Sequence, residues 1–144
     1  MREIKFRGKR IDNGEWVYGF YREVYMNYDF SHKCSEITYY DEYGFIFIWT
    51  LKVIPETVGQ YTGLKDKNNK EIYEGDIINI HQTVNGCNLF EIVWDKTKWN
   101  AKYAVEMVKP RLYEYIFNDL LDVDVFEKEI EVVGNIYEKK EYYY

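Results

Sequence analysis

The sequence is poor in proline and cysteine and has no long apolar run, and each shortage excludes a class of protein. Only 2 of the 144 residues are proline, which does not fit a proline-rich disordered chain. The two cysteines, Cys34 and Cys87, lie far apart and outside any paired spacing, so reduced thiols are expected in place of a disulfide scaffold. No apolar run reaches the roughly 18 residues that span a bilayer, and the first residues lack the apolar core of a signal peptide. We therefore expect a cytoplasmic protein with no membrane partner.

Positive charges are outnumbered by negative ones. Lys and Arg number 19 against 25 Asp and Glu, which gives a net charge of -6 at pH 7. Affinity for nucleic acid comes mainly from cationic side chains that release counterions, so this balance works against undirected phosphate binding. A local excess of cations lies in the first ten residues, where only Glu3 opposes Arg2, Lys5, Arg7, Lys9 and Arg10. On a strand, such charges form a solvated face opposite the apolar residues.

Aromatic side chains, in contrast, are abundant. The chain contains 16 Tyr, 8 Phe and 4 Trp residues, although its mean hydropathy is -0.54. Aromatic residues favour strands, which predicts a β-rich fold with amphipathic aromatic faces. A chain of this length fits one domain or two small ones, and a compact fold would bury roughly 68% of the surface of the unfolded chain.

Turn residues concentrate between Val53 and Ile80. Pro55 cannot donate a ladder hydrogen bond and forces the preceding residue into extended geometry, so it predicts the start of a new segment. Two glycines interrupt the strand predicted over 58–64, which indicates a bend or bulge. The polar run 66–69 predicts a hairpin tip, because Asp and Asn side chains cap their own backbone. A tight turn then leads into a strand over 76–80 and requires a positive φ at its glycine. The residues of this predicted turn motif are Gly59, Gly63, Asp66, Asn68, Glu74, Gly75 and Asp76.

Strand patterns and turn signals recur on both sides of this stretch. A hairpin is predicted from strands over 3–8 and 15–25 around an Asp-Asn-Gly turn, followed by a loop over 26–35. A second hairpin joins 37–40 to 45–49, and the segment 89–94 is predicted to pair with 77–82. The one helical pattern covers 111–121, with Pro110 near its first turn, and a last strand is predicted over 129–133. The predicted fold class is mainly β with one inserted α-helix.

Three segments resemble the YopX-type family of phage and prophage proteins: GQYTGLKDKNNKEIYEGDI over 59–77, REIKFRGKRIDNGEWVYGFY over 2–21 and VVGNIYEK over 132–139. The resemblance implies a self-associating protein that is encoded by a phage or prophage and has no established activity. It also implies a β-rich N-terminal part, taken as 1–54, and a C-terminal SH3-like barrel or roll over 55–144 that contains the helix near 111–121. The segments 23–49 and 83–125 match no motif of the family.

Side chains able to do chemistry are present, but their arrangement does not predict a reaction. Glu74 and Asp76 would suit acid-base or metal chemistry if their environments separated their pKa values, yet a turn also needs polar residues around its glycine. We take the structural interpretation. His32, Cys34, His81 and Cys87 are of residue types that bind zinc. They do not have the sequence spacing of a four-ligand structural zinc site. A Gly-rich phosphate loop and a nucleophile elbow are also missing, so we expect no enzyme, no metal site and no cofactor.

Two binding functions remain. The first is a self-associating module that meets a second copy or a protein partner through aromatic β surface, because Tyr and Trp are frequent interface anchors. Its candidate interface is the run 45–49, which is apolar on both faces and contains Phe45, Phe47 and Trp49. The alternative is a single-stranded nucleic-acid-binding protein whose barrel aromatics stack on bases beside the basic first strand. Its candidate contacts are Arg2, Lys5, Arg7, Tyr61, Tyr73 and Trp94. The acidic net charge places this alternative second.

Overall fold

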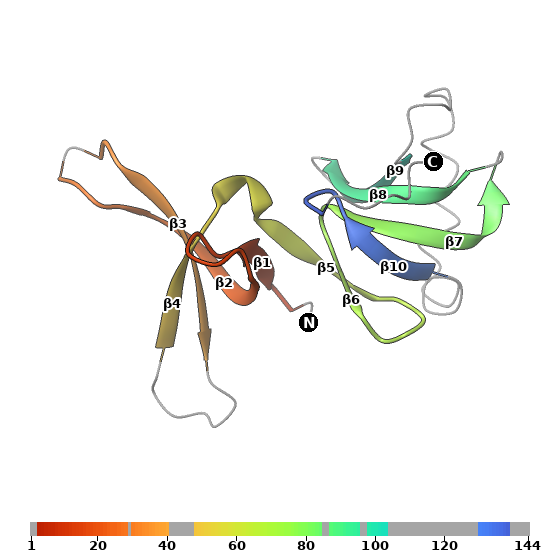
Figure 1. Ribbon diagram of the computed structural model, residues 1–144, viewed down its shortest axis with the longest axis horizontal. Coiled ribbons are helices and arrows are strands. Elements are labelled where there is room, and N and C mark those ends of the chain that lie inside the picture. The colour runs from red at the N-terminus through yellow and green to blue at the C-terminus, as the bar shows by residue number, and fades with distance from the viewer. Residues whose placement is uncertain are drawn as a thin grey trace. The chain divides into compact units, whose positions relative to one another are not determined.

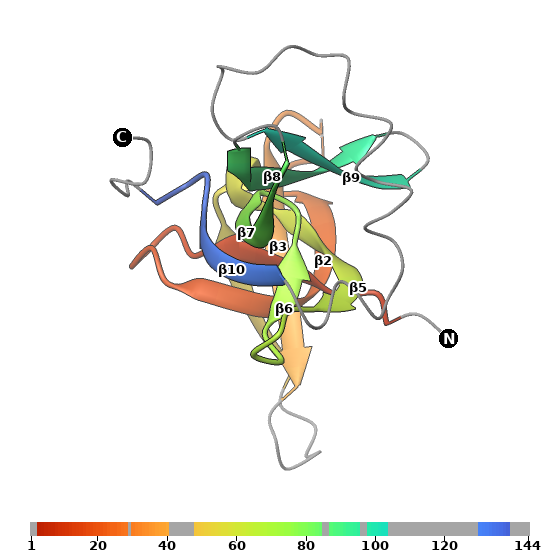
Figure 2. The same ribbon diagram turned by 90° about the vertical axis from the view of Figure 1, so that its right-hand side faces the viewer.

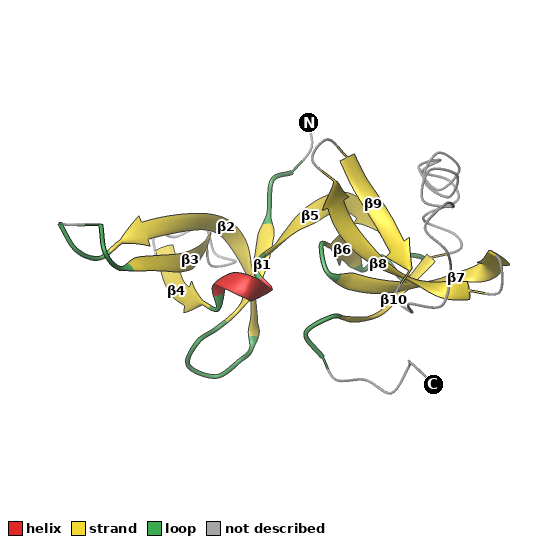
Figure 3. Cartoon of the chain, turned by 90° about the horizontal axis from the view of Figure 1, so that it is seen from above, coloured by secondary structure: helices red, strands yellow, loops and turns green. Residues whose placement is uncertain are grey.

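The computed structural model describes residues 3–28, 30–40, 48–84, 87–95, 98–103 and 130–138. These residues form a mainly β protein, with the strands β1 to β10 and one short 3-10 helix, η1 (Figures 1 and 3). Their contacts divide the chain into two compact units, Met1–Tyr61 and Thr62–Tyr144. No helix within the described ranges is long and apolar enough to cross a bilayer.

The first unit is an antiparallel sheet with the strand order β4-β3-β2-β1-β5. Its strands are β1 (Phe6–Lys9), β2 (Trp16–Tyr25), β3 (Lys33–Tyr40), β4 (Ile48–Val53) and the first residues of β5 (Gly59–Lys65). The turn between β1 and β2 has Gly14 at a φ of +72°, as the Asp-Asn-Gly signal predicts. Between β4 and β5 lies η1 (Pro55–Thr57), where the Thr57 hydroxyl donates to the Ile54 carbonyl and accepts from the Lys9 N–H.

Two glycines let the strands of the first unit pack closely. A Cβ at Gly8 would lie 3.1 Å from the Val53 Cβ, and one at Gly19 would lie 2.2 Å from the Thr38 carbonyl oxygen. Gly19 is also where β2 changes partner, because the residues up to it pair with β1 and those after it pair with β3. The fully buried Ile37 and Val53 form the core beside these glycines.

The second unit contains a four-stranded antiparallel sheet with the order β10-β7-β8-β9. Its strands are β7 (Asp76–Val84), β8 (Cys87–Asp95), β9 (Lys98–Tyr103) and β10 (Ile130–Asn135). Figure 2 shows β10 beside β7. The last residues of β5 pair with the short strand β6 (Glu71–Tyr73). Among the described residues, the core of this unit includes Ile72, Ile77, Ile78, Phe90, Ile92 and Ile130.

The predicted pairing of 89–94 with 77–82 is confirmed, since Ile78 of β7 lies opposite Phe90 of β8. The loop predicted over 26–35 is wrong at its end, because β3 already begins at Lys33 and its Cys34 pairs with Val24 of β2. The first four residues of β3 are Lys, Cys, Ser and Glu, so this half of the strand has no apolar alternation to mark it. Pairing with β2 holds it in the sheet.

The second predicted hairpin differs in its second strand. The apolar run predicted a strand over 45–49; its residues 45–47 lie outside the described residues, and β4 (Ile48–Val53) continues past its predicted end. The structure describes β4 as the partner of β3, with Tyr39 opposite Trp49 and Ser35 opposite Val53. Pairing with the polar first half of β3 therefore extends the strand past the apolar run.

Two expectations concern the C-terminal part and the division of the chain. The helix predicted over 111–121 lies outside the described residues, and the SH3-like barrel stays a prediction. The predicted division lay before Pro55, whereas the contacts place 55–61 with the first unit. Two interactions account for this placement: Thr57 accepts a hydrogen bond from the Lys9 N–H, and Gly59 pairs with Arg7 of β1.

The substitution Gly19→Ala is expected to lower the free energy of unfolding by about 1–3 kcal/mol, the usual cost of forcing extra atoms into a packed site. The added Cβ would meet the Thr38 carbonyl, which cannot move without disturbing the pairing of β2 with β3. Gly8→Ala is the matched control, because its Cβ would lie 3.1 Å or more from the side chains of Val53 and Ile37, so a much smaller displacement relieves the contact than the 2.2 Å approach to backbone at Gly19. Urea unfolding measures both values, and a loss for Gly8→Ala as large as that for Gly19→Ala would contradict this account.

Candidate functional site

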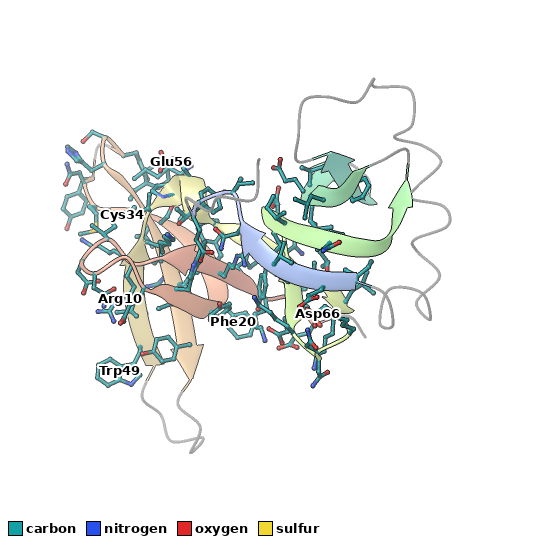
Figure 4. All side chains as sticks on the ribbon, turned by 45° about the vertical axis from the view of Figure 1, so that its right-hand side comes forward. Arg10, Phe20, Cys34, Trp49, Glu56 and Asp66 are labelled. Carbon is teal, nitrogen blue, oxygen red and sulfur yellow. The ribbon has the colours of Figure 1, made fainter. Side chains whose placement is uncertain are left out.

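The predicted turn motif centres on a buried carboxylate. Asp66 is only 3% exposed. Its Oδ1 accepts hydrogen bonds from the backbone N–H groups of Asn68 and Lys70 at 2.8 and 2.9 Å, and its Oδ2 accepts one from the Val132 N–H at 2.9 Å. This carboxylate, labelled in Figure 4, therefore joins the β5–β6 hairpin to β10.

A second buried aspartate closes the turn between β6 and β7. Asp76 is buried, and its Oδ2 accepts a hydrogen bond from the Tyr73 N–H at 2.8 Å. Gly75 has a φ of +81°, which confirms the prediction of a positive φ. Its N–H donates to the Ile92 carbonyl of β8, and its own carbonyl accepts from the Ile136 N–H. The turn thus joins β6 and β7 to β8 and to the residue that follows β10.

The remaining residues of the motif also lie where the backbone turns, bends or pairs with a neighbouring strand. Gly59 is buried opposite Arg7 of β1, and Gly63 has a φ of +87°. Glu74 is half-buried at the turn. The seven predicted residues therefore follow one run of turns and bends from β5 to the start of β7, which supports the structural interpretation of the acidic pair.

Of the candidate interface, the structure describes Trp49, whereas Phe45 and Phe47 lie outside the described residues. Trp49 is 54% exposed on β4 (Figure 4). This strand is an edge of its sheet. The exposed ring and the sheet edge therefore coincide on the same strand.

Only the end of this edge is covered in the described part of the chain. The Ile54 N–H donates to the Lys9 carbonyl at 2.8 Å, and the Ile11 N–H donates to the Lys52 carbonyl at 3.1 Å. An isolated bridge joins Arg10 to the last residue of β4. Along 48–51, no strand formed by the described residues pairs with this side of β4.

A cluster of exposed apolar side chains at the end of the β2–β3 hairpin was not predicted. The cluster, here called the hairpin tip, consists of Tyr25, Met26, Tyr28 and Phe30. The rings of Tyr25 and Phe30 meet edge to face with centroids 5.3 Å apart, and Phe30 has a left-handed φ of +57°. Together with Asn27, these residues line a hollow of about 370 Å³. The large apolar residues within a segment interpreted as a loop were the signal for this surface.

An ion pair lies beside the hairpin tip. Lys33 Nζ lies 2.6 Å from Glu23 Oε2, and the Tyr21 hydroxyl donates to Glu23 Oε1 at 3.0 Å. These hydrogen bonds, first that from Lys33 and then that from Tyr21, lower the pKa of Glu23. The hydrogen bond to Glu23 raises the pKa of Lys33. Both groups are therefore charged at neutral pH.

The histidines and cysteines, the candidate metal ligands of the sequence, do not form a metal site in the described part of the chain. His32 Nδ1 lies 3.1 Å from Asn27 Nδ2 and from Ser31 Oγ, and Cys34 is a free thiol in β3. The side chains of His81 and Cys87 are outside the described residues. Within the part of the chain that the structure describes, no three His, Cys, Asp or Glu side chains form a group suited to a metal ion.

The aromatic candidates for base stacking are not exposed where the structure describes them. Tyr61 and Tyr73 are both buried, so neither ring offers a face to a base. Arg2 and the side chain of Trp94 lie outside the described residues. Stacking by the described part of the chain would therefore need other rings.

The cations of the first strand contact aromatic rings. The guanidinium carbon of Arg7 lies 4.6 Å from the ring centroid of Trp16, and Lys9 Nζ lies 5.3 Å from the same ring. Lys5 Nζ lies 5.6 Å from the ring centroid of Tyr61. These distances are within the range of cation–π attraction.

Comparison with known proteins assigns the chain to a family. A family model described as YopX protein matches residues 5–142. The chain belongs to the YopX family. Its structure is similar to the crystal structure of protein EF1440 from Enterococcus faecalis, with 18% sequence identity, 94% of each chain covered and a TM-score of 0.45. No curated protein matches the chain.

Two of the segments that resemble the YopX family meet in the structure. The segment 59–77 contains Asp66 and Gly75, and the segment 132–139 contains Val132 and Ile136. The Val132 N–H donates to the Asp66 carboxylate, and the Ile136 N–H donates to the Gly75 carbonyl. The family motifs of this YopX chain therefore build one structural joint.

The substitution Asp66→Asn is expected to lower the free energy of unfolding by about 1–3 kcal/mol, because an amide group would turn N–H donors toward buried backbone N–H groups. Asp12→Asn is the matched control, since Asp12 is an exposed carboxylate that bonds to Arg10, and such surface changes usually stay within about 0.5 kcal/mol. Urea unfolding at neutral pH measures both. Equal stabilities of Asp66→Asn and the parent chain would contradict the structural role.

The substitutions Gly75→Ala and Gly14→Ala separate backbone strain from crowding. Both glycines have a positive φ, which costs an L-residue about 1–2 kcal/mol. A Cβ at Gly75 would also lie 3.3 Å from a ring carbon of Tyr137, whereas nothing lies within 4 Å of one at Gly14. We expect both variants to melt at lower temperature than the parent, with the larger decrease for Gly75→Ala. An unchanged melting temperature for Gly75→Ala would refute this assignment.

Proposed function

We propose that this YopX-family chain is a non-enzymatic protein that pairs with a second copy of itself through the edge strand β4. The observation that carries the proposal is the exposed Trp49 on an edge that stays open along 48–51 within the described residues. An open edge strand is a template for pairing with another chain. Pairing two β4 strands about a two-fold axis would bury the same residues on each copy.

The hydrogen bonds at the end of β4 identify the backbone groups that would form the contact. The Lys52 carbonyl and the Ile54 N–H point away from β3, because they bond to Ile11 and Lys9. Backbone direction in an antiparallel strand repeats every two residues, so Thr50 presents its N–H and carbonyl on the same outer side. Trp49 directs its backbone groups toward β3 and contributes its ring.

A protein partner at the hairpin tip is the second part of the proposal. Tyr25, Met26, Tyr28 and Phe30 expose large apolar groups close together. Aromatic residues and Met are enriched in protein interfaces, and clustered exposed apolar groups mark interaction sites. This surface is separate from β4, so both contacts can form on one chain.

The non-enzymatic part of the proposal is supported by what the buried carboxylates do. Asp66 accepts hydrogen bonds from backbone N–H groups of the β5–β6 turn and of β10, and Asp76 accepts one from the last residue of β6, which gives each a structural role. No cofactor enters the proposal. We place the protein in the cytoplasm of the host cell of a phage or prophage, and the support for this is the resemblance to the YopX-type family.

Sedimentation at micromolar concentration tests the self-association. We expect the parent chain to sediment as a discrete species larger than the 17.6 kDa monomer. Trp49→Asp is expected to return it to the monomer mass, because pairing would then bury a carboxylate. Thr50→Pro is expected to do the same, since proline removes the outward N–H and leaves the bonds to β3 in place.

Phe20→Asp is the matched control for Trp49→Asp. Phe20 and Trp49 are both 54% exposed, but Phe20 lies on the inner strand β2, so the larger species should persist. A parent chain that sediments only as a monomer would exclude the self-association. A larger species unaffected by either β4 variant would place the contact elsewhere on the chain.

A further inference from the structure

The strand β2 carries a row of aromatic side chains on the face opposite the core of the first unit. Trp16, Tyr18 and Phe20 occupy alternate positions, so their side chains stand on one face about 7 Å apart. Tyr18 is 45% exposed and Phe20 is 54% exposed. Figure 4 labels Phe20 on this strand. We propose that this face binds single-stranded nucleic acid, with bases stacked on Tyr18 and Phe20 and phosphates held by neighbouring cations.

The register of the sheet brings cations to both ends of this row. Residues directly opposite each other on neighbouring strands share a face. Arg7 lies opposite Tyr18 and Lys9 lies opposite Trp16 at one end. At the other end, Arg22 of β2 heads a cross-strand row that continues through Glu36 to Lys52.

The charge of this face is opposite to that of the whole chain. The paired rows from β1 to β4 contain four cationic residues and one carboxylate on this face. The cations are Arg7, Lys9, Arg22 and Lys52, and the carboxylate is Glu36. The chain as a whole has a net charge of -6. Because nucleic-acid affinity depends on cations that displace counterions from phosphates, the excess of cations on this face favours binding of a polyanion there despite the acidic net charge of the chain.

Two of the arginines have distinct roles. Arg7 is buried with its guanidinium carbon 4.6 Å from the Trp16 centroid, so it fixes that ring and adds local positive charge. Arg22 is more exposed, and its Nε and one terminal nitrogen donate to Glu36 Oε2 at 3.0 and 2.9 Å. A guanidinium has five N–H donors, so Glu36 holds Arg22 in place while further N–H groups face the solvent and a phosphate.

The centre of the face suits the edges of bases. Phe20 lies opposite Thr38, and Thr38 lies opposite Thr50. The two threonine hydroxyls lie 3.2 Å apart and are exposed to solvent. A flat base on Phe20 would thus have hydroxyl donors and acceptors at its rim. Stacking on exposed aromatics beside a cationic track is the usual recognition of single strands, and it is tolerant of base sequence.

Fluorescence anisotropy with labelled oligo(dT) and oligo(rU) of about 12 nucleotides tests this inference at low salt. We expect the full chain to bind a single strand and to bind a duplex of the same length more weakly, since paired bases cannot stack on the rings. Tyr18→Ala and Phe20→Ala should each weaken binding by about 5-fold to 150-fold, the range for one base–aromatic stack. Lys52→Gln should lower the slope of log affinity against log salt by about 0.7, the value for one phosphate of a single strand.

Tyr28→Ala is the matched control, because Tyr28 is a fully exposed tyrosine at the hairpin tip and its loss should leave the affinity unchanged. A preference for oligo(rU) or for oligo(dT) would identify the strand type, and either supports the inference. Absence of binding to both, equal binding of duplex and single strand, or parent-like affinity in the two aromatic variants would overturn it. If an aromatic variant fails to fold, the salt slope of Lys52→Gln decides, and an unchanged slope overturns the inference.

Discussion

The carboxylate of Asp66 is the interaction on which the second unit depends. Three backbone N–H groups, from Asn68, Lys70 and Val132, donate to its two oxygens at 2.8–2.9 Å. Hydrogen bonds to a charged group are the strong ones in proteins, and a buried donor left without an acceptor is costly. The carboxylate therefore shapes the turn between β5 and β6. It also holds the strand β10 against this turn, across a sequence separation of 66 residues. The Lys67–Glu131 ion pair, at 2.7 Å, supports the same junction.

The first unit depends on two glycines, which have no side chain. Gly8 and Gly19 leave space that Ile37 and Val53 fill, and at Gly19 the backbone of β3 comes too close for a Cβ. This packing chooses which face of the sheet becomes the core. The opposite face is left with aromatic and cationic side chains, which is the physical origin of the surface proposed to bind single strands.

The two proposed contacts of the sheet use different parts of it. Trp49 pairs with Tyr39, and this row alternates with the row through Phe20, Thr38 and Thr50. Since successive side chains of a strand point to opposite faces, Trp49 and Phe20 lie on opposite faces. Edge pairing through β4 would extend the sheet and leave the aromatic face of β2 open, so the two functions are compatible on one chain.

Local backbone chemistry was determined by the sequence itself. The turn glycines Gly14 and Gly75 have the positive φ values that their neighbours predict, and Asp66 bonds to the N–H groups two and four residues later, because each of these features depends on a few adjacent residues. The family assignment also follows from the order of residues. Only the tertiary structure decided which aromatic rings are accessible: Tyr61 and Tyr73 are buried, whereas Tyr18 and Phe20 are exposed. All four lie on strands, and a strand's alternation does not state which of its faces will pack, since that choice is made by distant residues such as Gly8, Ile37 and Val53 that meet only in the folded sheet.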